Sequence, residues 1–259
     1  MPHRANEPVV MAPRNKWIRG SLGNSESHLR LFCFPYAGAG ASAYLSWPSF
    51  FRPNGVDACR IQLPGRETRF NETPITVMND LAAQICDAIE PYLDLPFSFF
   101  GHSMGAVIAY EVARELSRRK RTLPQWLLMS GAVAPHRRQV ESLHALPIGE
   151  FLDAVARRYG GLPREVLANQ ELVDVVAPIL QTDFALIERY RHESEGPLAI
   201  KIAAFGGRHD RSVEPAELRY WRDLTAQPKR FEVMLFDGNH FFLHQQQQEL
   251  LSAIAHLLT

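Results

Sequence analysis

Short apolar runs alternate with helical patterns along most of this chain, and that alternation constrains its fold more than any other feature. Apolar segments of strand length recur at residues 29–35, 57–65, 97–101, 125–133, 198–207 and 230–238. Helical spacing is found at residues 44–51, 77–93 and 106–119, and again from about Phe242 to Leu258. Apolar strands separated by helices are typical of a parallel sheet covered on both faces. We therefore predict an α/β fold.

The third strand of this pattern runs directly into a serine between two glycines. Residues 97–105 read FSFFGHSMG, with Ser103 at the centre of G-x-S-x-G, and a helix with Ile108, Val112 and Leu116 on its apolar face follows. This is the context of a nucleophile elbow, in which a strained turn exposes a serine hydroxyl above the sheet. The alternative is a turn serine that only caps the helix. Because strand and helix are both in place, we interpret Ser103 as a nucleophile.

A serine nucleophile needs a base and an acid, which follow it in the order acid, histidine in folds of this kind. Among ten histidines, His240 lies just past the last strand and before the last helix, and His244, one helical turn further on, is its rival. Asp210, in GGRHDRSV after the preceding strand, would hold the imidazole of His240. Asp237 is the alternative acid, although it suits a cap of the local turn.

The same region should supply donors for an oxyanion. The N–H of Met104, at the start of the helix, is one expected donor, and the loop after the first strand offers Tyr36 and Ala37 for the second. Small residues at 37–41 let that backbone approach a substrate carbonyl. His102 follows its strand directly and is expected to be structural. These parts suit acyl transfer, most simply to water, and require no metal and no organic cofactor.

An insertion at about residues 139–195 interrupts the alternation. It holds the helical stretch IGEFLDAVARRY, which the glycines at 160–161 should end, and the stretch ELVDVVAPILQTDFALIERY, which Pro178 should kink or divide. Extra core helices would explain both, but loops at the carboxyl edge of a parallel sheet are where such folds bind ligands. We therefore expect a helical lid over an apolar channel. Residues 1–15 are expected to form a flexible arm and residues 16–259 one domain.

Charge and composition argue against several other classes of function. The 28 basic and 28 acidic residues cancel, which disfavours nucleic acid or an anionic membrane surface as partner. No apolar run reaches the ~18 residues of a membrane span, and the first residues contain no apolar signal core. Cys33, Cys59 and Cys86 lie in apolar stretches without metal-binding spacing, so we expect buried, reduced thiols and a cytoplasmic protein.

Five segments together resemble a known family. LRLFCFPYAGAGAS, LPGRE, FFGHSMGA, GGRHD and GNHFFL occur in that order and are similar to the type II thioesterases of polyketide and nonribosomal peptide biosynthesis, from about Trp17 to the C-terminus. The resemblance implies an α/β-hydrolase fold, with a mostly parallel sheet, flanking helices and a helical lid. It also implies hydrolysis of acyl groups from the phosphopantetheine arm of carrier proteins, which clears stalled or mis-primed chains. By motif position it implies a triad of Ser103, Asp210 and His240, with the N–H groups of Tyr36 and Met104 as oxyanion donors.

Two positions depart from the family's pattern. Ala39 and Asn239 each stand where the family usually has glycine, so Ala39 could narrow the entrance and Asn239 is expected to need an unusual backbone angle. Basic residues that could steer an acidic carrier protein gather near one helix end and after the next strand. They are Arg114, Arg118, Arg119, Lys120, Arg121, Arg137 and Arg138. The alternative is that they only complement the helix dipole.

Two other functions are compatible with these residues. A carboxylesterase, lipase or acyltransferase would use the same triad, because the leaving group and the acceptor are chosen by the lid and the entrance. A catalytically inactive hydrolase fold that serves as a binding module is the third reading. The complete set of Ser103, Asp210 and His240 argues against it, since such a module needs none of them.

Overall fold

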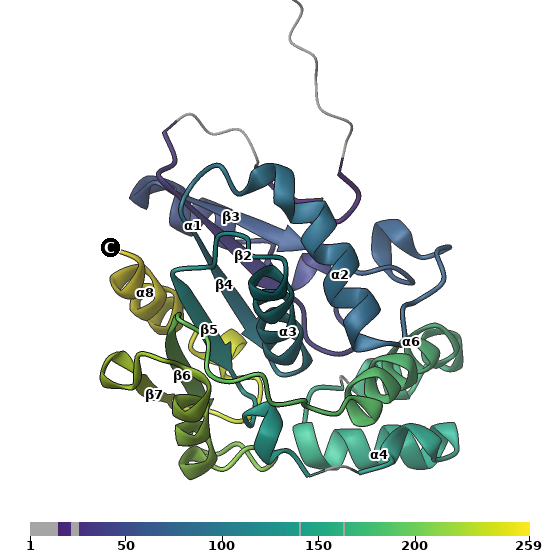
Figure 1. The fold of residues 1–259 in the computed structure, drawn as a ribbon. Helices are drawn as coiled ribbons and strands as arrows, with labels where there is room; N and C mark the ends of the chain where they lie inside the picture. The colour runs from purple at the N-terminus through teal and green to yellow at the C-terminus, as the bar shows by residue number, and fades with distance from the viewer. Residues whose placement is uncertain (1–14, 22–25, 140, 163) are drawn as a thin grey trace, which may run out of the picture.

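The computed structural model describes residues 15–21, 26–139, 141–162 and 164–259, so nearly all of the predicted arm lies outside the described residues. These residues form a seven-stranded sheet in the order β1-β3-β2-β4-β5-β6-β7 (Figure 1). The strands are β1 Ile18–Arg19, β2 Leu29–Phe34, β3 Val56–Ile61, β4 Phe97–His102, β5 Trp126–Ser130, β6 Lys201–Gly207 and β7 Glu232–Phe236. β1 runs antiparallel to β3, and all the other pairs are parallel.

The six predicted strands are confirmed, and only the two-residue β1 was not predicted. Every residue of β2, β4 and β5 is buried, as expected for central strands with helices on both faces. A strand of two residues carries no periodic signal, which is why β1 escapes detection from sequence. The parallel register sets Phe34, the last residue of β2, beside Gly101 in β4. The loop after β2 and the elbow after β4 therefore start side by side.

Helices cover both faces of the sheet (Figure 1). Helices α2, Met78–Ile89, and α3, Met104–Arg118, pack on one face with Phe32 and Phe34. Helices α1, Trp47–Phe51, and α8, Gln247–Leu258, pack on the other face with Leu31 and Cys33. Neighbouring residues of β2 thus enter opposite layers, as the alternation of side chains along a strand requires.

Three helices of the insertion lie beyond the carboxyl ends of the strands (Figure 1). They are α4 Ile148–Tyr159, α5 Arg164–Leu167 and α6 Gln170–Arg189, and α4 and α6 share an apolar cluster of their own. Gly160 ends α4 in a left-handed conformation, with φ of +70°, as predicted. Pro178 was predicted to kink or divide this stretch; α6 continues through it, so the helix is not divided. Packing of the apolar face of α6 outweighs the backbone hydrogen bond that proline removes.

Two other helices are shorter or more broken than predicted. The stretch 44–51 contains only the end of a 3₁₀ turn, Ala41–Tyr44, and the five-residue α1. The C-terminal stretch is divided into α7, Phe242–Gln245, and α8, because Gln246 leaves the helical region with φ of −117° and ψ of +37°. Nothing in its side-chain pattern announces this break.

The three cysteines are free and fully buried in the sheet and in α2. Burial raises the pKa of Cys33 and Cys59 well above the ordinary value, and it raises the pKa of Cys86 to about 12. All three side chains are therefore protonated thiols at neutral pH.

Candidate active site

The turn after β4 has the strained geometry of a nucleophile elbow. Ser103 has φ of +53° and ψ of −118°, a conformation that non-glycine residues rarely adopt, and its N–H donates to the carbonyl of Ser130 at 2.7 Å. A Cβ on Gly101 would lie 2.2 Å from the backbone oxygen of Gly105. A Cβ on Gly105 would lie 2.2 Å from the backbone oxygen of Phe34. Because both obstacles are backbone atoms, only glycine fits on either side of the serine.

The side chains of Asp210 and His240 meet at the carboxyl ends of β6 and β7. Asp210 Oδ2 lies 2.8 Å from His240 Nδ1, and both side chains are almost completely buried. The other oxygen, Oδ1, accepts from the N–H and the hydroxyl of Ser212 and from the N–H of Val213. Burial alone would raise the pKa of the Asp210 carboxyl, but the hydrogen bond and charge of His240, with the hydrogen bonds from Ser212, hold this pKa below its usual value. The carboxylate is thus ionised and fixed in orientation.

Ser103 and His240 line the same cavity. No hydrogen bond joins their side chains among the residues that the structure describes. The ring of Tyr159, at the end of α4, lies 5.0 Å from the ring of His240 and covers it from the side of the insertion. Asp210 and His240 are therefore brought together directly, whereas Ser103 shares a cavity with His240 and is hydrogen-bonded to neither in the described residues.

The rival candidates have other partners. Asp237 is exposed and contacts the equally exposed His209, with 3.2 Å between Oδ1 and Nε2. His244 Nε2 lies 2.9 Å from the hydroxyl of Tyr36. Burial lowers the pKa of His244. Neither rival is among the partners of His240 in the described residues.

His102 supports the elbow from below. It is completely buried, its Nδ1 lies 2.9 Å from the hydroxyl of Ser130, and its ring centroid lies 5.0 Å from that of His240. Burial, followed by the nearby His240 and His244, lowers its pKa well below the ordinary value, so the ring is neutral. A neutral ring beside His240 adds no charge to the site.

Two segments that line the cavity contain backbone N–H groups suited to bind an anion. Met104 is the first residue of α3, where helix N–H groups have no partner within the helix. The turn after β2 closes with a bond from the N–H of Ala39 to the carbonyl of Tyr36 at 3.1 Å. Among the loop, turn and cap hydrogen bonds of the described residues, none has the N–H of Met104, Tyr36 or Ala37 as donor. All three are available to an anion.

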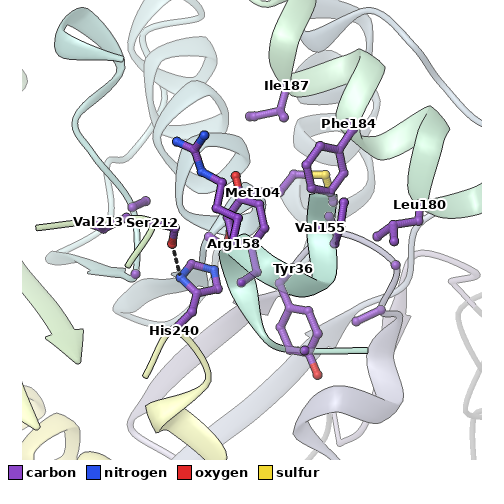
Figure 2. A pocket seen from close by; sticks show the side chains of 18 of the residues that line it. Tyr36, Met104, Val155, Arg158, Leu180, Phe184, Ile187, Ser212, Val213 and His240 are labelled. Atoms are coloured by element: carbon purple, nitrogen blue, oxygen red, sulfur yellow. Dashed lines mark hydrogen bonds between the residues drawn. The ribbon is translucent and has the colours of Figure 1, made fainter. Parts of the chain in front are cut away.

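The cavity above Ser103 has a volume of about 720 Å³. Figure 2 shows Met104 among side chains of the insertion, beside Val155 and Phe184. The apolar wall from the insertion consists of Val155, Leu162, Val176, Leu180, Phe184 and Ile187. Charged residues such as Arg158 and Glu188 line the cavity as well, so it combines an apolar wall, which suits an acyl chain, with polar groups.

The loop of His240 differs from one expectation. Asn239 was expected to need an unusual backbone angle, but it is not among the described residues with positive φ. Gly238, with φ of +126°, makes the sharp turn instead. Asn239 is used differently, since its side-chain oxygen accepts from the N–H of Phe241 at 2.9 Å.

Most of the predicted docking arginines are engaged in ion pairs. Arg114 pairs with Glu111 and Glu195, and Arg118 and Arg119 pair with Glu115. Arg121 pairs with Glu90. Arg138 donates to the carbonyl of Ile187 at the end of α6. Arg137 and Arg138 both line the cavity and join no ion pair in the described part of the chain, and the Arg137 guanidinium lies 4.3 Å from the centroid of the Tyr220 ring.

Two functional features were missed from sequence. Ser212 lies 2.9 Å from His240 Nδ1 as well as bonding to Asp210 (Figure 2). An aspartate whose side chain accepts from the N–H groups two and three residues on is a known turn signal, and it could have singled out Ser212. The second feature is a buried pair of Arg66 and Asp183, which no local pattern announces.

The described residues contain no cluster of three or more His, Cys, Asp or Glu side chains that could hold a metal ion. Among these same residues, none of the helices combines the length and apolar character needed to cross a membrane.

Comparisons with known proteins agree on one family. The model of the thioesterase domain family matches residues 29–258. Gramicidin S biosynthesis protein GrsT from Aneurinibacillus migulanus is 38% identical over 238 residues, which cover 92% of this chain and 91% of that protein. The type II thioesterase BorB from the borrelidin biosynthetic cluster has a TM-score of 0.83 at 32% identity, covering 94% of this chain and 98% of that one.

A third relative has the same fold over nearly its full length. RedJ, a thioesterase from the prodiginine biosynthetic pathway in Streptomyces coelicolor, has a TM-score of 0.82 at 33% identity, covering 96% of each chain. The resemblance carried by the five motifs is thereby confirmed: the chain belongs to the thioesterase family, a family of thioester hydrolases, and has the α/β-hydrolase fold of its type II members.

Proposed function

We propose that this chain hydrolyses acyl thioesters on the phosphopantetheine arm of carrier proteins, and so removes stalled or mis-primed chains in polyketide or nonribosomal peptide synthesis. The observation that carries the proposal is the strained Ser103, which lines the same cavity as His240, whose ring is bound in turn to the buried carboxylate of Asp210. The biosynthetic settings named for GrsT, BorB and RedJ support the pathway.

In this proposal Ser103 is the nucleophile. Its oxygen attacks the thioester carbon while His240 Nε2 takes the hydroxyl proton, and Asp210 stabilises the imidazolium through Nδ1. The N–H groups of Tyr36 and Met104 bind the oxyanion, in a site where such donors contribute a few kcal/mol to transition-state stabilisation. The C–S bond then breaks, the thiol sulfur leaves with the proton from His240, and an acyl-enzyme remains. Water, deprotonated by His240, releases the acid and restores Ser103.

The insertion acts as the lid in this scheme. We infer that residues 16–259 work as one domain and that the insertion at about 139–195 encloses the acyl chain. Apolar side chains from α4 and α6 line the same cavity as Ser103, which supports this role. No cofactor of the protein takes part, because the phosphopantetheine belongs to the substrate.

Carrier proteins are generally acidic, so their approach should depend on positive charge near the cavity. Arg137 and Arg211 line the cavity and join no ion pair in the described residues, whereas Arg121 is paired with Glu90. We therefore assign steering to Arg137 and Arg211. Arg137→Glu should raise KM for an acylated carrier protein in low salt, and Arg121→Glu serves as the control. An equal effect of both variants would contradict this docking face. Nucleic acid and membrane are not partners in this scheme, and the protein works in the cytoplasm.

The function is tested with a panel of acylated carrier domains, followed by mass spectrometry before and after incubation. The wild-type chain should return the free phosphopantetheine thiol, Ser103→Ala should not, and Ser252→Ala, at an exposed position of α8, should behave as wild type. A carboxylesterase would instead prefer p-nitrophenyl esters over every carrier. Failure of a fluorophosphonate to label Ser103 would favour an inactive binding module.

A further inference from the structure

The turn that carries the proposed oxyanion donor is not held by its own residues alone. The N–H of Ala39 bonds to the carbonyl of Tyr36, and Gly38 has φ of +79°, as the third position of a type II turn requires. In such a turn the central peptide, between Ala37 and Gly38, can rotate by about half a turn at modest cost, because its own N–H and carbonyl make no bond within the turn. A hydrogen bond from outside the turn is needed to hold this peptide in one orientation.

The acceptor for this peptide comes from the insertion. Asp183, in α6, accepts the N–H of Gly38 on Oδ2 at 2.7 Å. Arg66 binds the same carboxylate with both guanidinium arms, at 2.5 Å to Oδ2 and 2.7 Å to Oδ1. A third bond runs from Arg66 to the carbonyl of Ala39 at 3.2 Å. One buried ion pair thus joins three segments: the turn 36–39, the loop after β3, and α6.

The chemistry of this junction suits positioning better than stability. Asp183 and Arg66 are 2% and 4% exposed, and an ion pair at that depth loses about as much hydration energy as it gains in attraction. A carboxylate is, however, a stronger acceptor for a backbone N–H than a neutral group. The bidentate contact with Arg66 also restricts the carboxylate of Asp183 to one orientation. Leu180 of α6 packs against the Gly38 backbone, since a Cβ on Gly38 would lie 2.9 Å from the Cδ1 methyl carbon of Leu180.

We propose that Asp183 is a positioning residue, which fixes the Gly38 peptide and so holds the turn 36–39 in the place where the N–H groups of Tyr36 and Ala37 can bind the oxyanion at Ser103. Through Asp183 the insertion helps to shape the site as well as to cover it, and α6 must be in place for the oxyanion donors to be aligned. The inference rests on the proposed function, because it assumes that an oxyanion forms at Ser103.

The test uses the full chain with Asp183→Asn, which keeps the size of the side chain and removes its charge. With p-nitrophenyl butyrate, kcat should fall about 10- to 100-fold, since misplacing an aligned group by about 1 Å can cost about 100-fold. KM should change less than about threefold, because the apolar wall that would contact the acyl chain is unchanged in this variant. Butylboronic acid, which takes the electron pair of the Ser103 oxygen and becomes a tetrahedral anion, should bind more weakly by the same factor as kcat falls.

Asp57→Asn is the matched control. Asp57 is an equally buried carboxylate in an ion pair with Arg30, at the opposite, amino-terminal edge of the sheet. The Asp57→Asn variant should lose stability as Asp183→Asn does, but its kcat and its affinity for the boronate should stay as in wild type. Should Asp183→Asn not fold, Arg66→Lys is measured instead, since a lysine cannot bind both carboxylate oxygens of Asp183. It should show smaller losses of kcat and boronate affinity, again with little change in KM.

Three results would overturn the inference: an unchanged kcat in a folded variant, a fall in kcat without a matching loss of boronate affinity, or the same losses in Asp57→Asn. Ser103→Ala is measured alongside these variants. Turnover retained by Ser103→Ala refutes the proposed function itself. An inert Ser103→Ala together with an unaffected Asp183→Asn refutes only the role of Asp183.

Discussion

Replacing Asp210 with asparagine should leave the site folded and lower kcat by about four orders of magnitude. The hydrogen bonds of the carboxylate set the orientation of the new amide. Oδ1 of Asp210 accepts three donors, two from Ser212 and one from Val213, so the amide oxygen must occupy that place. The amide NH₂ then faces His240 Nδ1, where Oδ2 lies at 2.8 Å in the wild-type chain. Flipping the amide would point its hydrogens at three donors.

The tautomer of the imidazole follows from this geometry. A donor facing Nδ1 disfavours a proton on that nitrogen and shifts the proton of His240 to Nε2, which in that tautomer can no longer accept the proton of Ser103. The equivalent change in a serine protease triad lowers kcat about 10⁴-fold, which corresponds to about 5.4 kcal/mol in the barrier at about 1.36 kcal/mol per factor of ten. The fold of the site should persist, because all three bonds to Oδ1 survive.

The assay is steady-state release of free thiol from an acyl thioester, with thermal unfolding measured in parallel. Asp237→Asn is the matched control, since Asp237 is exposed and contacts only His209 among the described residues. Its kcat should stay within about twofold of wild type, as expected for a surface change away from the site. A loss below about tenfold in Asp210→Asn, or a larger loss in Asp237→Asn, would refute the assignment of the acid.

Three further predictions concern the surroundings of the site. Ser212→Ala removes a hydrogen bond to a charged carboxylate and should lower kcat about tenfold, so an unchanged kcat would show that Ser212 does not orient Asp210. Gly105→Ala should lower the free energy of unfolding by about 1–3 kcal/mol or more, because the added Cβ meets backbone atoms. The control Gly149→Ala, in α4 with open space around it, should be neutral or stabilising. Equal losses in thermal unfolding would contradict the argument that backbone atoms crowd position 105. Because burial lowers the pKa of His102, the unfolded chain binds a proton below pH ~6.5 that the folded chain does not. The free energy of unfolding therefore contains a contribution from neutral His102 that is complete above that pH and falls below it by about 1.4 kcal/mol per pH unit. Urea unfolding from pH 7 to 5.5 should show the free energy of unfolding of His102→Gln falling less steeply than that of wild type. Parallel pH profiles of the two proteins would contradict this.

The sequence predicts the parts of the site that short motifs carry. Ser103 can be proposed because its strand, turn and helix are contiguous. Asp210 and His240 can be proposed because each follows a strand, and the carboxyl ends of parallel strands share one edge of the sheet. The expected strands and the helix α4 are predicted for the same reason, since their patterns are local.

What the sequence does not predict depends on contacts between distant segments. Asp183 and Arg66 lie 117 residues apart, and only the docking of α6 brings them together. The continuity of α6 through Pro178 also depends on packing rather than on propensity. The arginines of α3 illustrate the opposite case: their sequence suggests a free positive face, but acidic residues from α2, α3 and the segment after α6 pair with them.

The burial of all three cysteines has a consequence for an enzyme that releases a thiol at each turnover. Disulfide exchange proceeds through an accessible thiolate, and the sulfurs of Cys33, Cys59 and Cys86 are neither accessible nor ionised. The folded chain should therefore stay free of mixed disulfides with its own product, even where pantetheine thiols accumulate and oxidise. The same property lets a chromogenic disulfide reagent follow turnover continuously, because every thiol it detects comes from the substrate.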